Sequence, residues 1–170
     1  MKNLEEIIGS INKSRMTLFI LCGLPYSGKT HIAREILKHA SCVYVSMDFI
    51  LTELGYDWDL NKLPDEQGWK EVIDISYQRS KKALKDSRNV LYDSTNHTRI
   101  SRDDLKKIAS EVNANVQIIY IDVAPDVVIK RWEQNKITKT RFILNEKLLN
   151  MTIDSMEIPT NEERPWILKN

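Results

Sequence analysis

The chain has 170 residues, of which 42% are hydrophobic and 29% are charged, a balance typical of one globular domain with a buried core. Its 25 basic and 24 acidic residues leave a net charge of +1, which excludes a protein held to nucleic acid by bulk electrostatic attraction. We expect no signal peptide and no membrane span, because the first residues are charged and no apolar run approaches about 20 residues.

Short β-branched runs alternate with amphipathic helical patterns along the chain. In chain order, the pattern predicts a helix at 3–12, a strand at 17–22, a helix ending near Ala40, a strand at 42–46, a short helix at 48–54, a loop at 55–68, a helix at 69–86, a strand at 89–93, a helix at 101–112, a strand at 116–122, a helix from Pro125 to about 134, a helix near 145–155 and a strand at 164–169. Such alternation predicts a parallel sheet with right-handed crossovers. We therefore expect a single α/β domain over residues 1–170.

Residues 23–30 read Gly-Leu-Pro-Tyr-Ser-Gly-Lys-Thr and match the P-loop pattern Gly-x-x-x-x-Gly-Lys-[Ser/Thr]. Glycines at both ends let backbone N–H groups point inward at an anion, and the following helix directs its positive end at the same point. Lys29 is expected to reach the β and γ phosphates of a nucleotide, and the Thr30 hydroxyl to bind Mg²⁺. The residues expected to bind ATP here are Gly23, Leu24, Pro25, Tyr26, Ser27, Gly28, Lys29 and Thr30.

Two acidic residues follow neighbouring strands. Asp93 ends the strand at 89–93, in the Walker B position from which a carboxylate orients Mg²⁺ directly or through water; a turn or helix-cap role is the alternative. Asp48 follows the strand at 42–46, on the edge of an open parallel sheet where ligands bind. There it can accept the proton of a hydroxyl that attacks the γ-phosphate. Alternatively, Asp48 is the N-cap of the helix that follows it.

A basic segment at about 132–145 follows the helix that begins at Pro125. We expect this segment to close as a lid and to place an arginine on the transferring phosphoryl group. Arg131 is the first candidate for this catalytic role, and Arg141 is a second residue expected to bind ATP. Lys136 and Lys139 lie in the same cluster. The alternative is a solvated charged surface.

The loop at 55–69 combines acidic and aromatic side chains, which suits a polar, cationic or ring-bearing acceptor. We therefore place Trp58 and Trp69 in the substrate site; a loop that buries its own tryptophans is the alternative. The histidines form no convincing metal set, so we expect surface or packing roles for His31, His39 and His97. Cys22 and Cys42 have no metal-type spacing, and we expect buried, reduced thiols in a cytoplasmic protein.

These pieces, in this order, resemble the small P-loop kinase family that includes phage-type polynucleotide 5′-kinases, zeta-toxin-like kinases and chloramphenicol phosphotransferase. The resemblance runs from about residue 17 to 163. It is carried by the loop 23–30, Val45-Ser-Met-Asp48, Asp93-Ser-Thr-Asn96 with Arg102 six residues later, Arg131, and Met156-Glu-Ile-Pro-Thr-Asn-Glu-Glu163. It implies a three-layer P-loop NTPase fold: a parallel five-stranded sheet of order 2-3-1-4-5, helices on both faces and a small lid. It also implies ATP-dependent phosphorylation of a hydroxyl, with Asp48 activating the acceptor and Asn96 and Arg102 on the substrate side.

Two departures from the family pattern bear on the acceptor. Polynucleotide 5′-kinases place an arginine about three residues after the general base, and this chain has Leu51 there. A second lid arginine, expected about four residues after Arg131, is replaced by Asn135, for which Lys136 or Arg141 are candidate substitutes. Both departures favour a small acceptor over a polynucleotide end.

The leading hypothesis is a cytoplasmic, ATP- and Mg²⁺-dependent kinase acting on a hydroxyl of a small-molecule or nucleoside-like acceptor. Lys29, Asp48 and Arg131 are its expected catalytic residues. The first alternative is a polynucleotide 5′-hydroxyl kinase, which would take nucleic acid as a partner. The second, from another class, is a nucleotide-binding switch or ATPase module that acts through a partner.

Overall fold

A parallel five-stranded sheet of order β2-β3-β1-β4-β5 forms the centre of the molecule. The structure is a computed structural model that describes residues 2–57, 60 and 62–170. The strands are β1 (Thr17–Cys22), β2 (Val43–Ser46), β3 (Val90–Asp93), β4 (Asn115–Asp122) and β5 (Trp166–Lys169). All six residues of β1 are buried, because β1 pairs with β3 on one side and with β4 on the other. The parallel sheet predicted from the sequence, and the strand order implied by the family resemblance, are confirmed.

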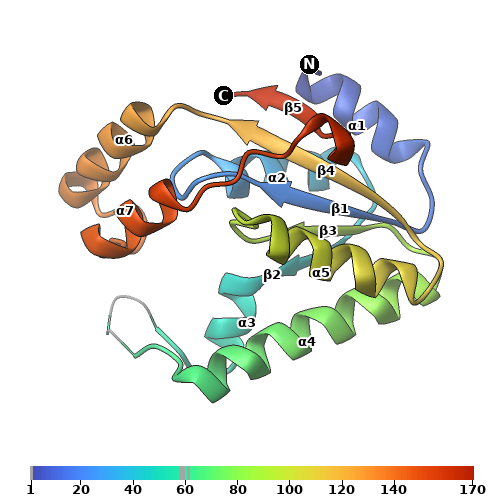
Figure 1. The fold of residues 1–170 in the computed structure, drawn as a ribbon, viewed down its shortest axis with the longest axis horizontal. Coiled ribbons are helices and arrows are strands. Elements are labelled where there is room, and N and C mark those ends of the chain that lie inside the picture. Colours follow the sequence, from blue (N-terminus) through green and yellow to red (C-terminus); the bar gives the residue numbers. More distant parts are fainter. Residues whose placement is uncertain (1, 58–59, 61) are drawn as a thin grey trace.

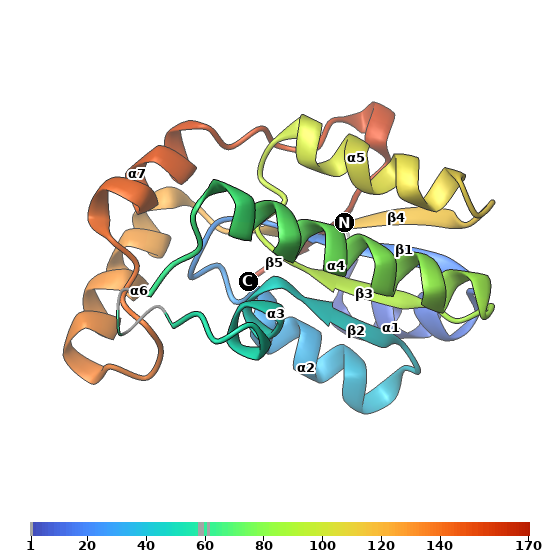
Figure 2. The same cartoon turned by 90° about the horizontal axis from the view of Figure 1, so that it is seen from below.

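Helices cover both faces of the sheet (Figures 1 and 2). They are α1 (Leu4–Asn12), α2 (Lys29–His39), α3 (Met47–Glu53), α4 (Glu66–Lys85), α5 (Arg99–Ser110), α6 (Pro125–Thr138) and α7 (Glu146–Asp154), with a short 3₁₀ helix, η1 (Asn161–Glu163). Successive strand residues point to opposite faces. Phe19 and Leu21 accordingly pack into the core with α1, α2 and α6, whereas Leu18 and Ile20 pack with α3, α4 and α5.

The carboxyl ends of the strands lie at one edge, on the left of Figure 1, and α6 and α7 lie beyond that edge. The register pairs Ser46 at the end of β2 with Asp93 at the end of β3. The segments that follow β1, β2 and β3 therefore meet at this edge, which is where ligands bind in open α/β sheets.

Several helix ends differ from the sequence prediction for local reasons. α3 begins one residue earlier than expected, and the Ser46 side chain caps it by accepting the Phe49 N–H. α4 begins at Glu66, three residues earlier than expected, because Asp65 caps it through the Gly68 N–H at 2.8 Å. α6 continues to Thr138, and Lys139, in a left-handed conformation, ends it.

Both cysteines are free thiols; Cys22 is buried in β1, and Cys42 is only partly buried just before β2. Among the helices that the structure describes, none combines the length and the apolar character that a membrane span requires.

Candidate active site

The loop 23–30 joins β1 to α2 at the carboxyl edge of the sheet. Gly23 and Gly28 have φ angles of 154° and 97°. A Cβ on Gly23 would lie 2.9 Å from the Ile121 carbonyl oxygen, so a side chain does not fit there. The Ser27 hydroxyl is buried and has no hydrogen-bond partner. A buried polar group without a partner is unfavourable unless a ligand supplies one, so this loop fits a polar ligand such as phosphate.

Lys29 folds back onto this loop from the first turn of α2. Its Nζ donates to the carbonyl oxygens of Gly23 at 2.9 Å and Leu24 at 2.7 Å. Burial lowers the pKa of Lys29 to about 8, although the carboxylate of Asp93 opposes the shift. The two carbonyl groups thus hold the ammonium in place beside the loop, where a phosphate would meet it.

Thr30 and Asp93 bring two oxygen ligands together beneath the loop. Thr30 Oγ1 donates to Asp93 Oδ2 at 3.4 Å, and the Tyr44 hydroxyl donates to the same oxygen at 2.6 Å. Burial, together with the charge of Asp93, raises the pKa of Tyr44 and keeps its hydroxyl a donor. Hydroxyl and carboxylate oxygens suit Mg²⁺, which takes most of its remaining ligands from water and phosphate. The residues present therefore fit a Mg²⁺ site held by Thr30 and Asp93.

Asp48 lies in the first turn of α3, where it lines the cavity and is open to solvent. The interpretation of Asp48 as the N-cap is wrong, because Ser46 occupies the cap position. Desolvation by the surrounding cavity wall raises the pKa of Asp48 and the charge of Asp93 raises it further, while Arg141 and Lys29 oppose the shift. A carboxylate with a raised pKa is a stronger proton acceptor, which suits a general base.

These side chains surround one cavity of about 300 Å³, a volume at the small end of the range for ligand pockets. Its lining brings together the P-loop, α3, the end of β3 with the segment that follows it, α4, the segment before α7, and α7. The lining residues are Pro25, Tyr26, Gly28, Lys29, Thr30, Met47, Asp48, Leu51, Trp69, Asp93, Ser94, Thr95, His97, Arg141, Phe142, Leu144, Leu148 and Thr152. The other tryptophan assigned to the substrate site, Trp58, lies outside the described residues.

The two lid arginines occupy different places. Arg131 is not among the described residues that line the cavity; its Nη1 donates to the carbonyl oxygens of Tyr26 at 3.3 Å and Ser27 at 3.2 Å. It therefore braces the P-loop from outside. Arg141 does line the cavity, with its guanidinium carbon 4.5 Å from the centre of the Tyr26 ring.

Comparison with known proteins identifies the family to which the chain belongs. Residues 16–166 match the family described as "Chromatin associated protein KTI12". The chain belongs to this family. It is also 31% identical over 139 residues to the L-seryl-tRNA(Sec) kinase of Methanococcus maripaludis, an alignment that covers 79% of this chain and 50% of that protein. The chain thus spans about half the length of this relative.

Two solved structures have the same fold as this KTI12-family chain. A chain of the Pnkp1/Rnl/Hen1 RNA repair complex matches with a TM-score of 0.71 and 21% identity, over 82% of this chain and 43% of that one. Chaetomium thermophilum Kti12 in complex with ADP-AlF3 matches with a TM-score of 0.66 and 17% identity, over 90% and 88% of the two chains. The comparisons confirm the small P-loop kinase family and its fold.

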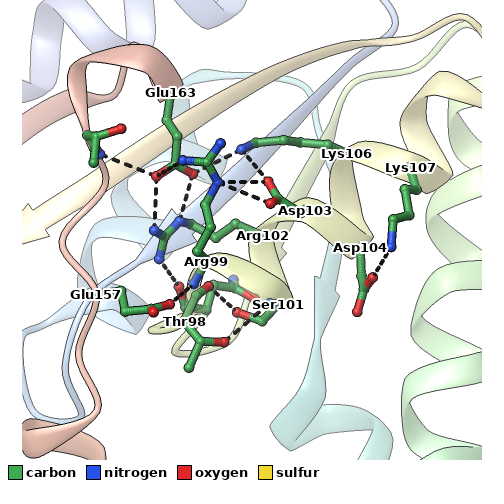
Figure 3. A network of polar contacts seen from close by, with 12 residues as sticks. Thr98, Arg99, Ser101, Arg102, Asp103, Asp104, Lys106, Lys107, Glu157 and Glu163 are labelled. Atoms are coloured by element: carbon green, nitrogen blue, oxygen red, sulfur yellow. Dashed lines mark hydrogen bonds and ion pairs between the residues drawn. The ribbon is translucent and has the colours of Figure 1, made fainter.

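Two residues assigned to the substrate side, Asn96 and Arg102, are buried in this KTI12-family chain and outside the cavity lining. Asn96 Nδ2 donates to the Leu21 carbonyl at 2.7 Å. The Arg102 guanidinium donates to both carboxylate oxygens of Glu163, at 2.9 and 3.0 Å, and to the Asn96 carbonyl at 3.1 Å (Figure 3). Both side chains are thus committed to fixing the segment after β3, and we do not retain them as substrate contacts.

His97 lines the cavity, although the sequence predicted a surface or packing role for it. The Thr95 hydroxyl and His97 Nδ1 lie 3.2 Å apart. Burial, with the nearby charge of Lys29, lowers the pKa of His97 and so favours its neutral imidazole. The sequence did contain one sign that His97 lies in the site, because His97 directly follows Asp93-Ser-Thr-Asn96. Leu148 and Thr152 of α7 gave no such signal, because only the fold brings α7 to the P-loop.

Proposed function

We propose that this chain binds ATP with Mg²⁺ on the loop 23–30 and transfers the γ-phosphoryl group to a hydroxyl of an acceptor. The observation that carries the proposal is the meeting of Lys29, Asp48 and Asp93 around one cavity. Lys29 and Asp93 alone would serve a nucleotide switch equally well. A carboxylate with a raised pKa that lines the same cavity is what an acceptor hydroxyl requires.

In the proposed reaction the acceptor hydroxyl lies against Asp48. Its oxygen forms a bond to the γ-phosphorus, its proton passes to the Asp48 carboxylate, and the bond from the γ-phosphorus to the bridging oxygen breaks to release ADP. Lys29 offsets negative charge on the phosphates. Mg²⁺ held by Thr30 and Asp93 would neutralise further charge there. Positioning and electrostatic stabilisation account for most of the expected rate enhancement.

The cavity walls favour a compact acceptor. Tyr26, Trp69 and Phe142 supply aromatic surface, and a volume of about 300 Å³ accommodates a small hydroxyl compound or a nucleoside-like group. The base of a nucleoside-like group is flat and could pack against such aromatic side chains.

A second candidate places the acceptor hydroxyl on an RNA. A neighbouring hollow of about 420 Å³ shares His97, Leu148 and Thr152 with the cavity, so a larger acceptor has room to continue outward along α7. The relative from Methanococcus maripaludis is named as a kinase of seryl-tRNA(Sec). This candidate keeps the same donor site and the same base and changes only what carries the hydroxyl.

The test is transfer of label from γ-labelled ATP to nucleosides, sugars, antibiotics, 5′-hydroxyl oligonucleotides and seryl-tRNA. Asp48→Asn should reduce transfer about 100-fold, in line with loss of a general base, and leave ATP affinity within about twofold. Asp126→Asn is the matched control, because Asp126 is likewise an exposed aspartate in the first turn of a helix but lies outside the cavity lining. Phosphoryl transfer at the wild-type rate by Asp48→Asn would show that Asp48 is not the general base. ATP hydrolysis that labels no acceptor and needs a partner protein would favour the switch or ATPase.

A further inference from the structure

The lid segment 140–144 is fixed by hydrogen bonds from both sides. Asn135, on α6, is only 4% exposed, and its amide spans the turn that follows the helix. Its Nδ2 donates to the Arg141 carbonyl at 2.9 Å and the Phe142 carbonyl at 3.4 Å. Its Oδ1 accepts from the Thr140 hydroxyl at 3.1 Å and the Arg141 N–H at 3.2 Å. The residue that replaces an expected lid arginine thus shapes the backbone on both sides of Arg141.

Tyr26 reaches the same segment from the P-loop. Its hydroxyl donates to the Phe142 carbonyl at 3.2 Å and accepts from the Leu144 N–H at 3.1 Å. Its backbone is left-handed, with φ at 60°, a conformation unfavourable for a bulky residue and often found at functional sites. A P-loop residue is therefore bonded directly to the backbone of the lid.

The Tyr26 ring also supports the side chain of Arg141. The guanidinium of Arg141 lies 4.5 Å from the centre of the Tyr26 ring and 5.1 Å from that of Phe142. So placed, Arg141 lines the cavity, and its charge acts on both Lys29 and Asp48. The cation thus faces the space between the phosphate loop and the proposed base.

Two other cations in or next to the lid are engaged in contacts of their own. Lys136 lies over the Trp132 ring at 4.2 Å and pairs with Glu133 at 3.1 Å. Arg131 donates to the carbonyl groups of Tyr26 and Ser27 and is not among the described residues that line the cavity. Within the described part of the lid, Arg141 is the one cation among the residues that line the cavity.

We propose that Tyr26 and Asn135 are positioning residues that hold the lid so that Arg141 contacts the γ-phosphoryl group of ATP. The inference rests on the proposed function, because it needs a γ-phosphate at the P-loop. Arg141 takes the role that the sequence pattern gave to a second arginine on α6. The Tyr26 side chain links the conformation of the phosphate loop to the position of that charge.

The inference is tested by measuring, for each variant, the dissociation constants of ATP and ADP with Mg²⁺ present, and kcat. Arg141→Ala should lower kcat about 100-fold, in line with the loss of one preorganised group that stabilises the transition state. It should also reduce the preference for ATP over ADP about tenfold and leave ADP affinity within twofold, because only the γ-phosphate meets Arg141. Lys136→Ala is the matched control and should leave all these values unchanged.

Tyr26→Phe separates the hydroxyl from the ring. It retains the surface beneath Arg141 but removes the bonds to Phe142 and Leu144, so kcat and the ATP preference should fall about three- to tenfold with ADP affinity unchanged. Millimolar guanidinium ion should restore activity to Arg141→Ala, and restore less to the double variant Tyr26→Phe/Arg141→Ala. Unaltered kcat and ATP preference in Arg141→Ala would overturn the assignment of Arg141, and the same result in Tyr26→Phe would overturn the positioning role.

Failure of this inference is distinguishable from failure of the proposed function. The ratio of ATP to ADP affinity needs no acceptor, so it reports on Arg141 even where the acceptor is unknown. Wild-type protein that does not bind ATP would remove both proposals. A third outcome would overturn only the role of Arg141. In that outcome Lys29→Ala abolishes ATP binding, but Arg141→Ala retains the wild-type preference for ATP over ADP.

Discussion

Asp48 accepts the proton in the proposed reaction, so its ionisation sets how the rate depends on pH. Desolvation by the surrounding cavity wall and the charge of Asp93 raise the pKa of Asp48. The ionised form is the base, so kcat should fall about tenfold per pH unit below that pKa, at a higher pH than an ordinary aspartate with a pKa near 3.9 would give. The measurement is kcat against pH at saturating ATP and acceptor.

The variant Arg141→Ala provides a second test of the assignment of the pH profile to Asp48. Its positive charge favours ionised Asp48, so Arg141→Ala should move the acidic limb of the profile to higher pH. Lys136→Ala should leave the limb in place, because Lys136 pairs with Glu133. A limb that stays fixed in Arg141→Ala would argue that another group titrates there.

At the scale of elements, the segment after β3 is held by an ion cluster that joins α5 to η1. The Glu163 side chain is completely buried, and Arg102 and Lys106 both donate to it (Figure 3). Arg102 also holds the Asn96 carbonyl, in the segment that carries Thr95 and His97 to the cavity wall. The cluster therefore connects the C-terminal part of the chain to the shape of the site.

Glu163→Gln should lower the free energy of unfolding by about 3–5 kcal/mol, because it leaves the buried guanidinium of Arg102 without a counter-charge. Urea denaturation measures the change. Glu53→Gln is the control, since its ion pair with Arg79 is half-exposed and screened by solvent, so its loss should cost far less stability. Equal losses in the two variants would contradict a special role for the buried cluster.

The buried ion pair between Glu163 and Arg102 also predicts how the stability of the fold depends on pH. Burial by itself raises the pKa of Glu163, but hydrogen bonds from Arg102 and Lys106 outweigh it and lower the pKa to about 2. A carboxyl whose pKa is lower in the folded state stabilises the fold above its unfolded value, and that contribution is lost as pH falls toward the folded value. The difference between wild type and Glu163→Gln should therefore shrink between about pH 4.5 and 2.

Element types followed from hydrophobic periodicity, whereas some element ends depended on single capping contacts. Asp65 starts α4 three residues before the predicted start at Trp69, because it accepts the Gly68 N–H. Ser46, the last residue of β2, caps α3 and leaves the carboxylate of Asp48 out of the cap. Polar residues that suit caps also suit loops and sites, so the sequence alone left these alternatives open.

At the scale of the whole molecule, the alternation of strands and helices sufficed to place Lys29, Asp48 and Asp93 on one edge of the sheet, because parallel strands end on the same side. It did not separate the roles of Arg131 and Arg141. Their places depend on how the segment after α6 folds back onto Tyr26, through contacts between residues more than 100 positions apart. Charge patterning identifies such a segment as basic but carries no information about which side chain turns inward.

Binding at that edge should stabilise the entire fold, because Mg-ATP contacts the native P-loop and not the unfolded chain. A ligand at 100 times its dissociation constant adds about 2.7 kcal/mol to the free energy of unfolding, which for a chain of this size raises Tm by about 5–11 °C. Thermal denaturation with ATP and with ADP, each at 100 times its own dissociation constant for the wild type, measures the effect. Lys29→Ala should lose both shifts. Arg141→Ala should keep the ADP shift and lose part of the ATP shift, because only ATP offers a phosphate to the lid. A Tm that ATP leaves unchanged would show that the P-loop does not bind the nucleotide at all.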